Sequence, residues 1–205
     1  FNDLEKLIQK PKKFFKNKKI IITAGSTIEL IDPVRYLSNR SSGMMGCEIA
    51  NAFYDQGANV VLVKGPCKYM QNENIFCINI KSGEEMLNAV ENNIEGCDIF
   101  VSVAAVSDFT AKDRADKKIK SNDKLTLELK KNVDILKTIA KNYKVFTIGF
   151  AAETNDLKSN AVKKLKNKDI SIIAANKVSL SEGIDNENNS ITLYWGEGLE
   201  KTLEL

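Results

Sequence analysis

The chain contains no histidine among its 205 residues. This absence excludes Ser-His-Asp and Cys-His nucleophile systems and removes the commonest general base of enzymes. It also leaves the cysteines without the usual partner of a zinc site, and no two of them form a C-x-x-C pair. We therefore expect reduced thiols, and any catalysis must use lysine, arginine, carboxylates, amides, backbone N–H groups or a metal. The four cysteines are Cys47, Cys67, Cys77 and Cys97.

The chain also has little net charge and no long apolar run. Its 30 basic residues nearly balance its 27 acidic ones, giving a net charge of +3. These values do not predict nucleic acid or an anionic membrane as a partner. No apolar stretch approaches the roughly 20 residues of a membrane span, and no signal peptide is evident, so we expect a cytoplasmic protein. The basic run QKPKKFFKNKK is interpreted as a solvated linker in preference to a binding tail.

Apolar, β-branched segments alternate with helical patterns along most of the chain. Several segments are apolar on both faces, which is typical of parallel strands covered by helices on each side. The pattern predicts one α/β domain with a Rossmann-like, doubly wound, mostly parallel sheet. A helix is expected at 45–56, and Ser82 with Glu85 predicts a capping box at the start of another. The predicted strands are KIIITA, NVVLVK, IFCINI, the run beginning CDIFVSV, YKVFTIGFAAE and ISIIAANKV.

Two segments depart from this alternation. A lysine-rich loop and the run LTLELK form a projecting piece between about residues 107 and 131. LTLELK alternates strictly, which predicts a strand with one face solvated or covered by a partner. Near the C-terminus, SEGIDNENNSITLYW predicts a turn-rich loop that leads into an edge strand.

About twenty polar residues separate the first strand from the helix that follows it, where a compact α/β unit needs only a few. The glycines of this insert are too far apart for the dinucleotide fingerprint, but SSGMMG opens the helix, where free N–H groups favour an anion. Arginines add phosphate donors, and an asparagine adds an orienting amide. Ordinary capping and solvated arginines are the alternative. The candidate residues are Gly25, Arg35, Asn39, Arg40, Gly43 and Gly46.

Further candidates follow the other strands, at the sheet edge where ligands bind in this fold. Asp108 is either a loop cap or a ligand-orienting carboxylate. Phe150 is either core or a ring that stacks on a base. Asn176 is either a left-handed turn residue or an amide that contacts a ligand. The run KKIKS, which contains Lys118, is either solvated or part of the site. The residues alone thus indicate a nucleotide or phosphate-rich ligand and lysine chemistry.

The motifs ITAGSTIELIDPVRYLSNRSSGMMG, VAAVSDF, KKIKS, LTLELKKNVDIL, IGFAAET and IIAANKVS, in this order and spacing, resemble phosphopantothenoylcysteine synthetase. The form resembled is bacterial, the C-terminal half of a bifunctional coenzyme A biosynthesis protein. The resemblance begins near Lys19. It implies a linker and N-terminal helix at 1–18 and a ligase domain at 19–205. A chain that starts without methionine suits a piece of a longer protein, and a final helix would be expected beyond Leu205.

The resemblance implies ligation of 4′-phosphopantothenate to L-cysteine. CTP is the co-substrate, an acyl-cytidylate is the intermediate, and Mg²⁺ assists. FMN would belong only to a fused N-terminal decarboxylase. A homodimer would form through residues 118–131. No nucleic acid and no membrane partner is expected.

Residue roles implied by the resemblance follow the matching positions. Asn39 and Lys118 would be catalytic, with Lys118 on a mobile loop. The substrate and intermediate would contact Asn39, Arg35, Arg40 and Ala105. The nucleotide would contact Gly25, Ser26, Ser42, Gly43, Gly46, Asp108, Lys118, Phe150, Ala151 and Asn176, with Ser42, Gly43 and Gly46 around the triphosphate.

Departures from the family pattern stand at Ser26, Ser121 and Lys177, where proline, lysine and aspartate are frequent. Two rival functions use the same sheet. A nicotinamide-dependent reductase would require G-x-G-x-x-G or a Tyr-x-x-x-Lys pair, and the chain has neither. A catalytically silent nucleotide-binding module would not require Lys118.

Overall fold

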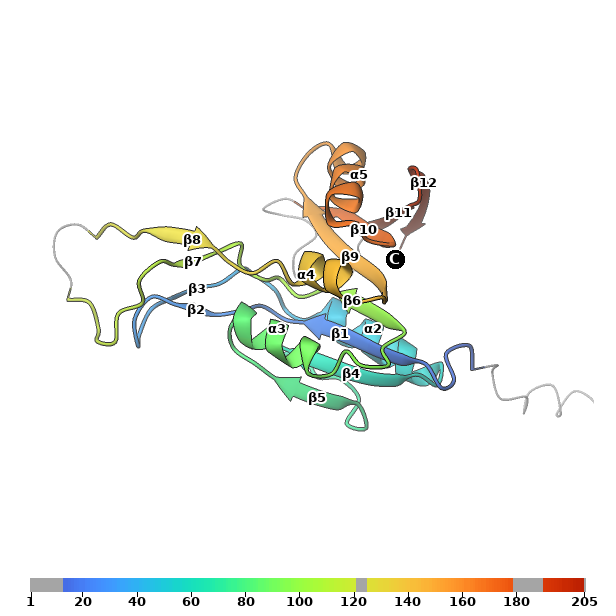
Figure 1. The fold of residues 1–205 in the computed structure, drawn as a ribbon, viewed down its shortest axis with the longest axis horizontal. Coiled ribbons are helices and arrows are strands. Elements are labelled where there is room, and N and C mark those ends of the chain that lie inside the picture. The colour runs from blue at the N-terminus through green and yellow to red at the C-terminus, as the bar shows by residue number, and fades with distance from the viewer. Residues whose placement is uncertain (1–12, 121–124, 179–189, 205) are drawn as a thin grey trace, which may run out of the picture.

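The computed structural model describes residues 13–120, 125–178 and 190–204. Its central sheet has eight strands in the order β12-β11-β10-β9-β6-β1-β4-β5 (Figure 1). Within this order the neighbouring strands β10, β9, β6, β1, β4 and β5 run parallel. The chain order reverses between β1 and β6, which confirms the predicted doubly wound topology. The bounds are β1 Lys19–Ala24, β4 Asn59–Lys64, β5 Phe76–Asn79, β6 Ile99–Ser102, β9 Phe146–Glu153, β10 Ile172–Lys177, β11 Ser190–Trp195 and β12 Leu199–Glu204.

Helices cover both faces of this sheet because its central strands are apolar on both sides. In β1, Ile20 and Ile22 point toward α2 (Met44–Asp55), whereas Ile21 belongs to the core on the opposite face. That second core is closed by α3 (Gly83–Glu91), α4 (Ile135–Asn142) and α5 (Leu157–Lys168). None of the described helices is long and apolar enough to cross a membrane.

Side-chain caps define where two of the helices begin. The Ser82 hydroxyl accepts the amide of Glu85 at 3.2 Å, as predicted, while the Glu85 carboxylate accepts the amide of Lys81 instead of that of Ser82. Asp134 caps α4 by accepting the amide of Lys137 at 3.1 Å. These bonds satisfy amides that a helix start leaves without intrahelical partners.

The long insert after β1 is a hairpin and not a loop. Its strands β2 (Glu29–Leu30) and β3 (Tyr36–Leu37) pair with each other, and β2 lies beside a second ribbon. That ribbon consists of β7 (Phe109–Ala111) and β8 (Leu129–Lys131). Together these strands form an arm that projects from the sheet (Figure 1). The projection predicted at 107–131 is therefore present in its described residues, 107–120 and 125–131, and the insert contributes to it.

Two predicted strands differ from the structure. LTLELK forms a strand only from Leu129, because its partner β7 ends at Ala111 and only one further backbone bond, from Lys112 to Glu128, extends the ribbon. The predicted edge strand, β11, lies inside the sheet, because the chain turns at Gly196 and Gly198 and returns as β12. Most of the predicted N-terminal helix and linker falls outside the described residues.

Candidate functional site

A cleft opens at the carboxyl ends of β1, β6, β9 and β10, where the strand order reverses. We name it the glycine cleft; its volume is about 250 Å³. Gly25 follows β1 with φ 76°, and Gly43 precedes α2 with φ 79°, both in the left-handed region that favours glycine. The predicted residues that line the cleft are Gly25, Arg40, Ser42, Gly43, Gly46, Ala105, Phe150 and Asn176.

Close packing explains why two of these positions are glycine. A Cβ on Gly46 would lie 2.5 Å from the Cβ of Ala24, so its absence lets the first turn of α2 rest against β1. A Cβ on Gly43 would lie 2.5 Å from the sulfur of Cys67. The helix start is thereby held at the carboxyl end of β1, directly beside the cleft.

The first turn of α2 offers unpaired backbone donors to this cleft. The Met44 amide donates weakly to the Ser42 hydroxyl at 3.4 Å, and Gly43 provides no side-chain cap. The amides of Met45 and Gly46 have no hydrogen-bond partner within the described ranges. Free amides and the positive end of the helix dipole suit an anion, as the sequence predicted.

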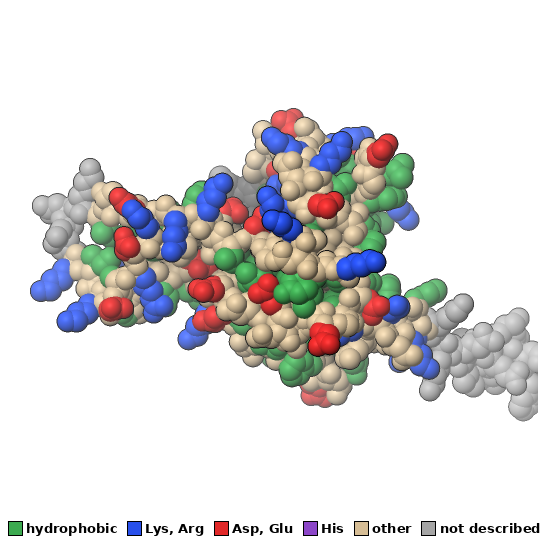
Figure 2. Space-filling model, viewed as in Figure 1, with side chains coloured by type: hydrophobic (Ala, Val, Ile, Leu, Met, Phe, Trp, Pro, Cys, Tyr) green, Lys and Arg blue, Asp and Glu red, His purple; other side chains and the backbone are tan. Residues whose placement is uncertain are grey.

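A second, larger cleft of about 530 Å³ adjoins the first. We name it the lysine cleft, because Lys131, Lys164 and Lys168 line it. Lys164 and Lys168 form ion pairs with Glu153 and Asp134 at 2.6 and 2.9 Å. Figure 2 shows Lys and Arg side chains gathered over α5, which carries two of these lysines, and over the arm. The lysine cleft and the glycine cleft share Ala104, Ala105 and Phe150.

Two buried threonines, one in β1 and one in the segment after it, hold the loop between the clefts. The Thr23 hydroxyl accepts the amides of Val103 and Ala104, both at 3.2 Å, and Thr27 accepts the amide of Ser107 at 3.1 Å. The backbone of Ala105 adds a bond to Gly25 at 2.8 Å. The loop that separates the two clefts is therefore fixed by hydrogen bonds to β1 and to the segment that follows β1.

Asn39 lies beside this loop. Its amide nitrogen donates to the carbonyl of Val106 at 3.0 Å, which leaves the amide oxygen without a partner in the described part of the chain. Val106 lines the lysine cleft. The structure thus brings Asn39 to the border of the site, where an amide can orient a ligand.

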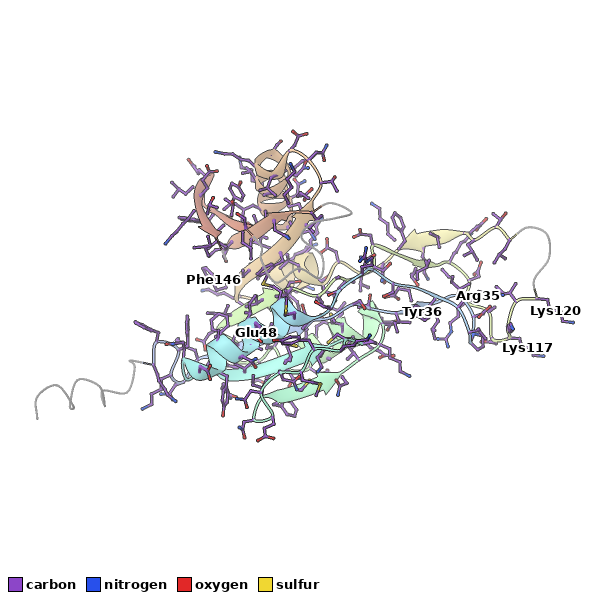
Figure 3. The ribbon with its side chains drawn as sticks, turned by 180° about the vertical axis from the view of Figure 1, so that it is seen from behind. Arg35, Tyr36, Glu48, Lys117, Lys120 and Phe146 are labelled. Carbon is purple, nitrogen blue, oxygen red and sulfur yellow. The ribbon has the colours of Figure 1, made fainter. Side chains whose placement is uncertain are left out.

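Arg35 and Lys118 do not join these residues within one chain. Asp32, which is fully buried, accepts the amides of Val34 and Arg35 at 2.7 and 2.8 Å and the Arg35 guanidinium at 2.7 Å. Its second oxygen also accepts the amide of Ile119, next to Lys118, at 3.1 Å. Figure 3 shows Arg35 on the arm and Lys117 and Lys120 at its outer part, away from the sheet.

The electrostatics of Asp32 follow from these contacts. Burial alone would raise the pKa of Asp32, but the amides of Val34, Arg35 and Ile119 and the Arg35 guanidinium lower the pKa to about 2. The carboxylate therefore stays ionised at neutral pH and ties the two ribbons of the arm together.

The remaining predicted residues take other places. Asp108 lines the lysine cleft, and its carboxylate makes no ion pair or hydrogen bond in the described part of the chain. Ser26 is buried. Its backbone forms an isolated parallel β-bridge with Ala105, and its hydroxyl donates to the carbonyl of Pro66 at 3.4 Å. Ala151 is buried in the core closed by α3, α4 and α5, and it lines neither cleft. Asn176 belongs to β10, which excludes the left-handed turn.

Sequence reasoning missed the lysine cleft. Lys164 and Lys168 lie on α5, where lysines near a helix C-terminus complement the helix dipole and so do not by themselves indicate a binding site. Lys131 and Asn132 follow LTLELK, and Asn132 donates to the carbonyl of Ser107 at 2.9 Å. A signal was available in the spacing of Lys164 and Lys168, because residues four apart share one helix face.

A doubly wound sheet with such clefts at its switch point is the arrangement of domains that bind phosphorylated small molecules. The chain belongs to the family of DNA/pantothenate metabolism flavoprotein C-terminal domains, whose model matches residues 15–205. It is 43% identical over 196 residues to the coenzyme A biosynthesis bifunctional protein CoaBC of Vibrio vulnificus, across 93% of this chain and 49% of that protein. The chain thus spans about half the length of the curated relatives it matches.

Solved structures agree with this assignment. The crystal structure of the C-terminal domain of a coenzyme A biosynthesis bifunctional protein CoaBC superposes with a TM-score of 0.77 at 36% identity, covering 93% of this chain and 87% of that one. A Cab2 variant in complex with phosphopantothenate-cysteine gives a TM-score of 0.79 over 99% of this chain and 83% of that one. At 16% identity, the second likeness concerns the fold alone.

Proposed function

We propose that the chain catalyses the CTP-dependent ligation of 4′-phosphopantothenate and L-cysteine through an acyl-cytidylate, as a step of coenzyme A biosynthesis. The observation that carries this proposal is a pair of clefts that share one wall at the switch point, one lined by free helix amides and the other by lysines. A ligase that activates a carboxylate with a nucleoside triphosphate must hold two anionic ligands with their reacting atoms in contact. The family and the 43% identical bifunctional relative support the same reaction.

The two clefts suit different ligands. The lysine cleft, at about 530 Å³, has the size of a small-molecule site and lysines for a triphosphate, while Phe150 offers a ring to the base. The glycine cleft, at about 250 Å³, is smaller and offers amides to a single phosphate group. We therefore assign CTP to the lysine cleft and the phosphate of 4′-phosphopantothenate to the glycine cleft. This reverses the expectation from the sequence, which placed the triphosphate beside the glycines.

The proposed reaction has two steps. The pantothenate carboxylate attacks the α-phosphorus of CTP, an O–P bond forms, and the bond to pyrophosphate breaks. The amine of cysteine then attacks the acyl carbon, CMP leaves with the bonding electrons of the C–O bond, and the amine proton passes to water. Asn39 orients the acyl group through its amide, and Lys118 stabilises the charge that develops on the α-phosphate.

Magnesium fits this arrangement as a companion of the triphosphate. In the described part of the chain, no group of three or more histidine, cysteine, aspartate or glutamate side chains could hold a metal ion. Mg²⁺ is usually held by phosphates, waters and one or two carboxylates. Asp108, on the wall of the lysine cleft, offers such a carboxylate, and the ion would neutralise triphosphate charge.

The arm supports a homodimer through residues 118–131. The apolar residues of LTLELK form an exposed row on the arm, with Leu125 and Leu129 about half exposed at 51% and 46%. A monomer gains nothing from such a row, whereas a second copy would bury it. Since Arg35 and Lys118 lie outside the clefts of their own chain, we propose that each arm delivers them to the clefts of the other protomer. A fused decarboxylase that binds FMN would complete the full-length protein.

The test is release of pyrophosphate from CTP and magnesium, with and without 4′-phosphopantothenate, followed by release of CMP when cysteine is added. Lys118→Gln should abolish pyrophosphate release, because a neutral amide cannot offset the α-phosphate charge. Lys112→Gln is the matched control, since Lys112 lies on the same arm but forms an exposed ion pair with Glu128. Its turnover should equal that of the unmodified protein.

Two outcomes would contradict the proposal. Undiminished turnover in Lys118→Gln would remove this lysine from the mechanism. CTP binding without any acid-dependent pyrophosphate release would identify a nucleotide-binding module instead of a ligase.

A further inference from the structure

A third cleft lies outside the two clefts assigned to the ligase. It opens at the carboxyl ends of β4 and β5, on the other side of β1 from the lysine cleft, and has a volume of about 680 Å³. We name it the β4–β5 cleft. Apolar side chains and amides line it together with two lysines and one carboxylate. The residues that matter here are Lys64, Gln71, Asn79, Lys81 and Glu85.

Lys64, the last residue of β4, places a buried charge at this cleft. The residue is only 6% exposed. Its ammonium donates to the side-chain oxygen of Gln71 at 2.7 Å, and makes longer contacts with the carbonyl of Tyr69 at 3.5 Å and the sulfur of Met70 at 4.0 Å. All three partners are neutral, and no carboxylate lies within ion-pair distance of Lys64 in residues 13–120, 125–178 and 190–204.

A buried ammonium without a counter-ion is costly. Buried charges are normally paired or bound to a ligand, because neutral acceptors replace the lost hydration only in part. The Glu85 carboxylate lines the same cleft but accepts the backbone amide of Lys81 at 2.8 Å and does not reach Lys64. The geometry thus leaves the place beside Lys64 for an anion that the chain itself does not supply.

The position in the fold indicates what kind of anion. A doubly wound sheet consists of two halves, each suited to a mononucleotide, and β1, β4 and β5 form the first half. In dinucleotide-binding sheets, an acidic residue near the end of the strand after the first helix accepts ribose hydroxyls. β4 is that strand, and its last residue is a lysine. A positively charged lysine at this position suits a phosphate, whereas an aspartate or glutamate there suits hydroxyl groups.

We propose that the β4–β5 cleft binds a second phosphorylated ligand of mononucleotide size, with its phosphate on the ammonium of Lys64. Gln71 holds the ammonium in place while the cleft is open, and Lys81 contributes a second positive charge at the rim. The cleft is larger than the lysine cleft, so a mononucleotide fits it. This site needs neither CTP nor the arm.

The probe is adenosine 5′-monophosphate, titrated by calorimetry in the absence of the ligase substrates. Lys64→Met keeps the length of the side chain and removes the charge, and it should weaken binding about 10- to 100-fold, the usual value of a hydrogen bond to a charged group. Unphosphorylated adenosine should bind the unmodified protein at least tenfold more weakly. Lys164→Met, in the lysine cleft, is the matched control and should leave the affinity unchanged.

A second measurement does not depend on any variant folding. In amide NMR spectra of the unmodified protein, the monophosphate should shift the signals of Gly65 and Asn79, which line the β4–β5 cleft. Loss of binding in Lys164→Met with retention in Lys64→Met would place the ligand in the lysine cleft and overturn the proposal. Absence of binding at millimolar monophosphate would also overturn it. Because no ligase substrate is present, neither result depends on whether the chain is a ligase.

Discussion

Thr23→Val tests whether hydrogen bonds from β1 hold the wall between the glycine cleft and the lysine cleft. The substitution preserves shape but removes the hydroxyl that accepts the amides of Val103 and Ala104. An orphaned buried donor costs roughly 1–3 kcal/mol. Both distances are 3.2 Å and the loop borders clefts that water can enter, so the lower value applies to each amide. The added methyl group returns about 0.8 kcal/mol. The net loss of stability should be about 1–1.5 kcal/mol.

Urea unfolding followed by circular dichroism measures this loss. With a slope of about 2 kcal/mol per molar urea, the midpoint should fall by about 0.5–0.8 M. Because the wall residue Ala104 borders both clefts, the affinity for CTP, measured by calorimetry, should fall with it. Thr27→Val orphans one amide instead of two, so a cost of about 1 kcal/mol against a return of about 0.8 kcal/mol should leave stability almost unchanged.

Thr192→Val is the matched control for both variants. Thr192 is also buried, but its hydroxyl contacts that of Thr202 in the terminal hairpin, at 3.0 Å. The same substitution there should leave CTP affinity unchanged. If Thr23→Val keeps the midpoint and the CTP affinity of the unmodified protein, the two threonine bonds do not hold the wall, and the reasoning is wrong.

Four further predictions concern the arm, the lysine cleft and a buried thiol. Leu127→Asp places a charge in the exposed apolar row and should yield monomers in sedimentation velocity, with loss of turnover; an unchanged dimer would contradict the proposed interface. Asp32 has its pKa lowered from 3.8 to about 2, so its support of the arm is complete above about pH 4 and is lost as the pH falls through 2. The NMR signals of its amide donors should shift in that window and not in Asp32→Asn. Lys164→Met should weaken CTP binding about three- to tenfold by calorimetry, because the lysine is partly exposed and already paired. Cys47, whose pKa burial raises to about 11, should resist iodoacetamide at pH 8 until the protein unfolds, as judged by mass spectrometry.

The sheet could be predicted because each central strand has a recognisable local sequence pattern. β1 reads KIIITA, apolar on both faces, and only a central strand covered by helices on both sides can bury such a run. The start of α3 at Ser82 was equally local, since the cap and Glu85 are three residues apart. The terminal hairpin was missed because LEKTLE has no buried face of its own, and its place depends on the exposed edge that β11 leaves.

The site was predicted in part, and the missing part is spatial. Gly25 follows a strand, Gly43 precedes a helix, and Phe150 lies in the C-terminal half of β9, so topology alone brings them together. The lysine cleft is lined by residues of α5 and of the end of β8. These segments are far apart in the sequence, so no local pattern predicts that they lie side by side. The role of Lys118 is spatial in the same way, because the arm carries it away from the clefts of its own chain and only the proposed second protomer would bring it to a cleft.

The carboxylate of Asp32 has a mechanical consequence. Because it bonds residues 34 and 35 of one ribbon and residue 119 of the other, the two ribbons cannot bend independently at that point. Arg35 reinforces the junction by donating also to the carbonyl of Ile119 at 3.1 Å. A rotation at the base of the arm therefore moves Arg35 and the backbone of Lys118 together, as one rigid unit. A surface that binds the arm would contact both cations at once, and Asp32, not the partner, would set the spacing between them.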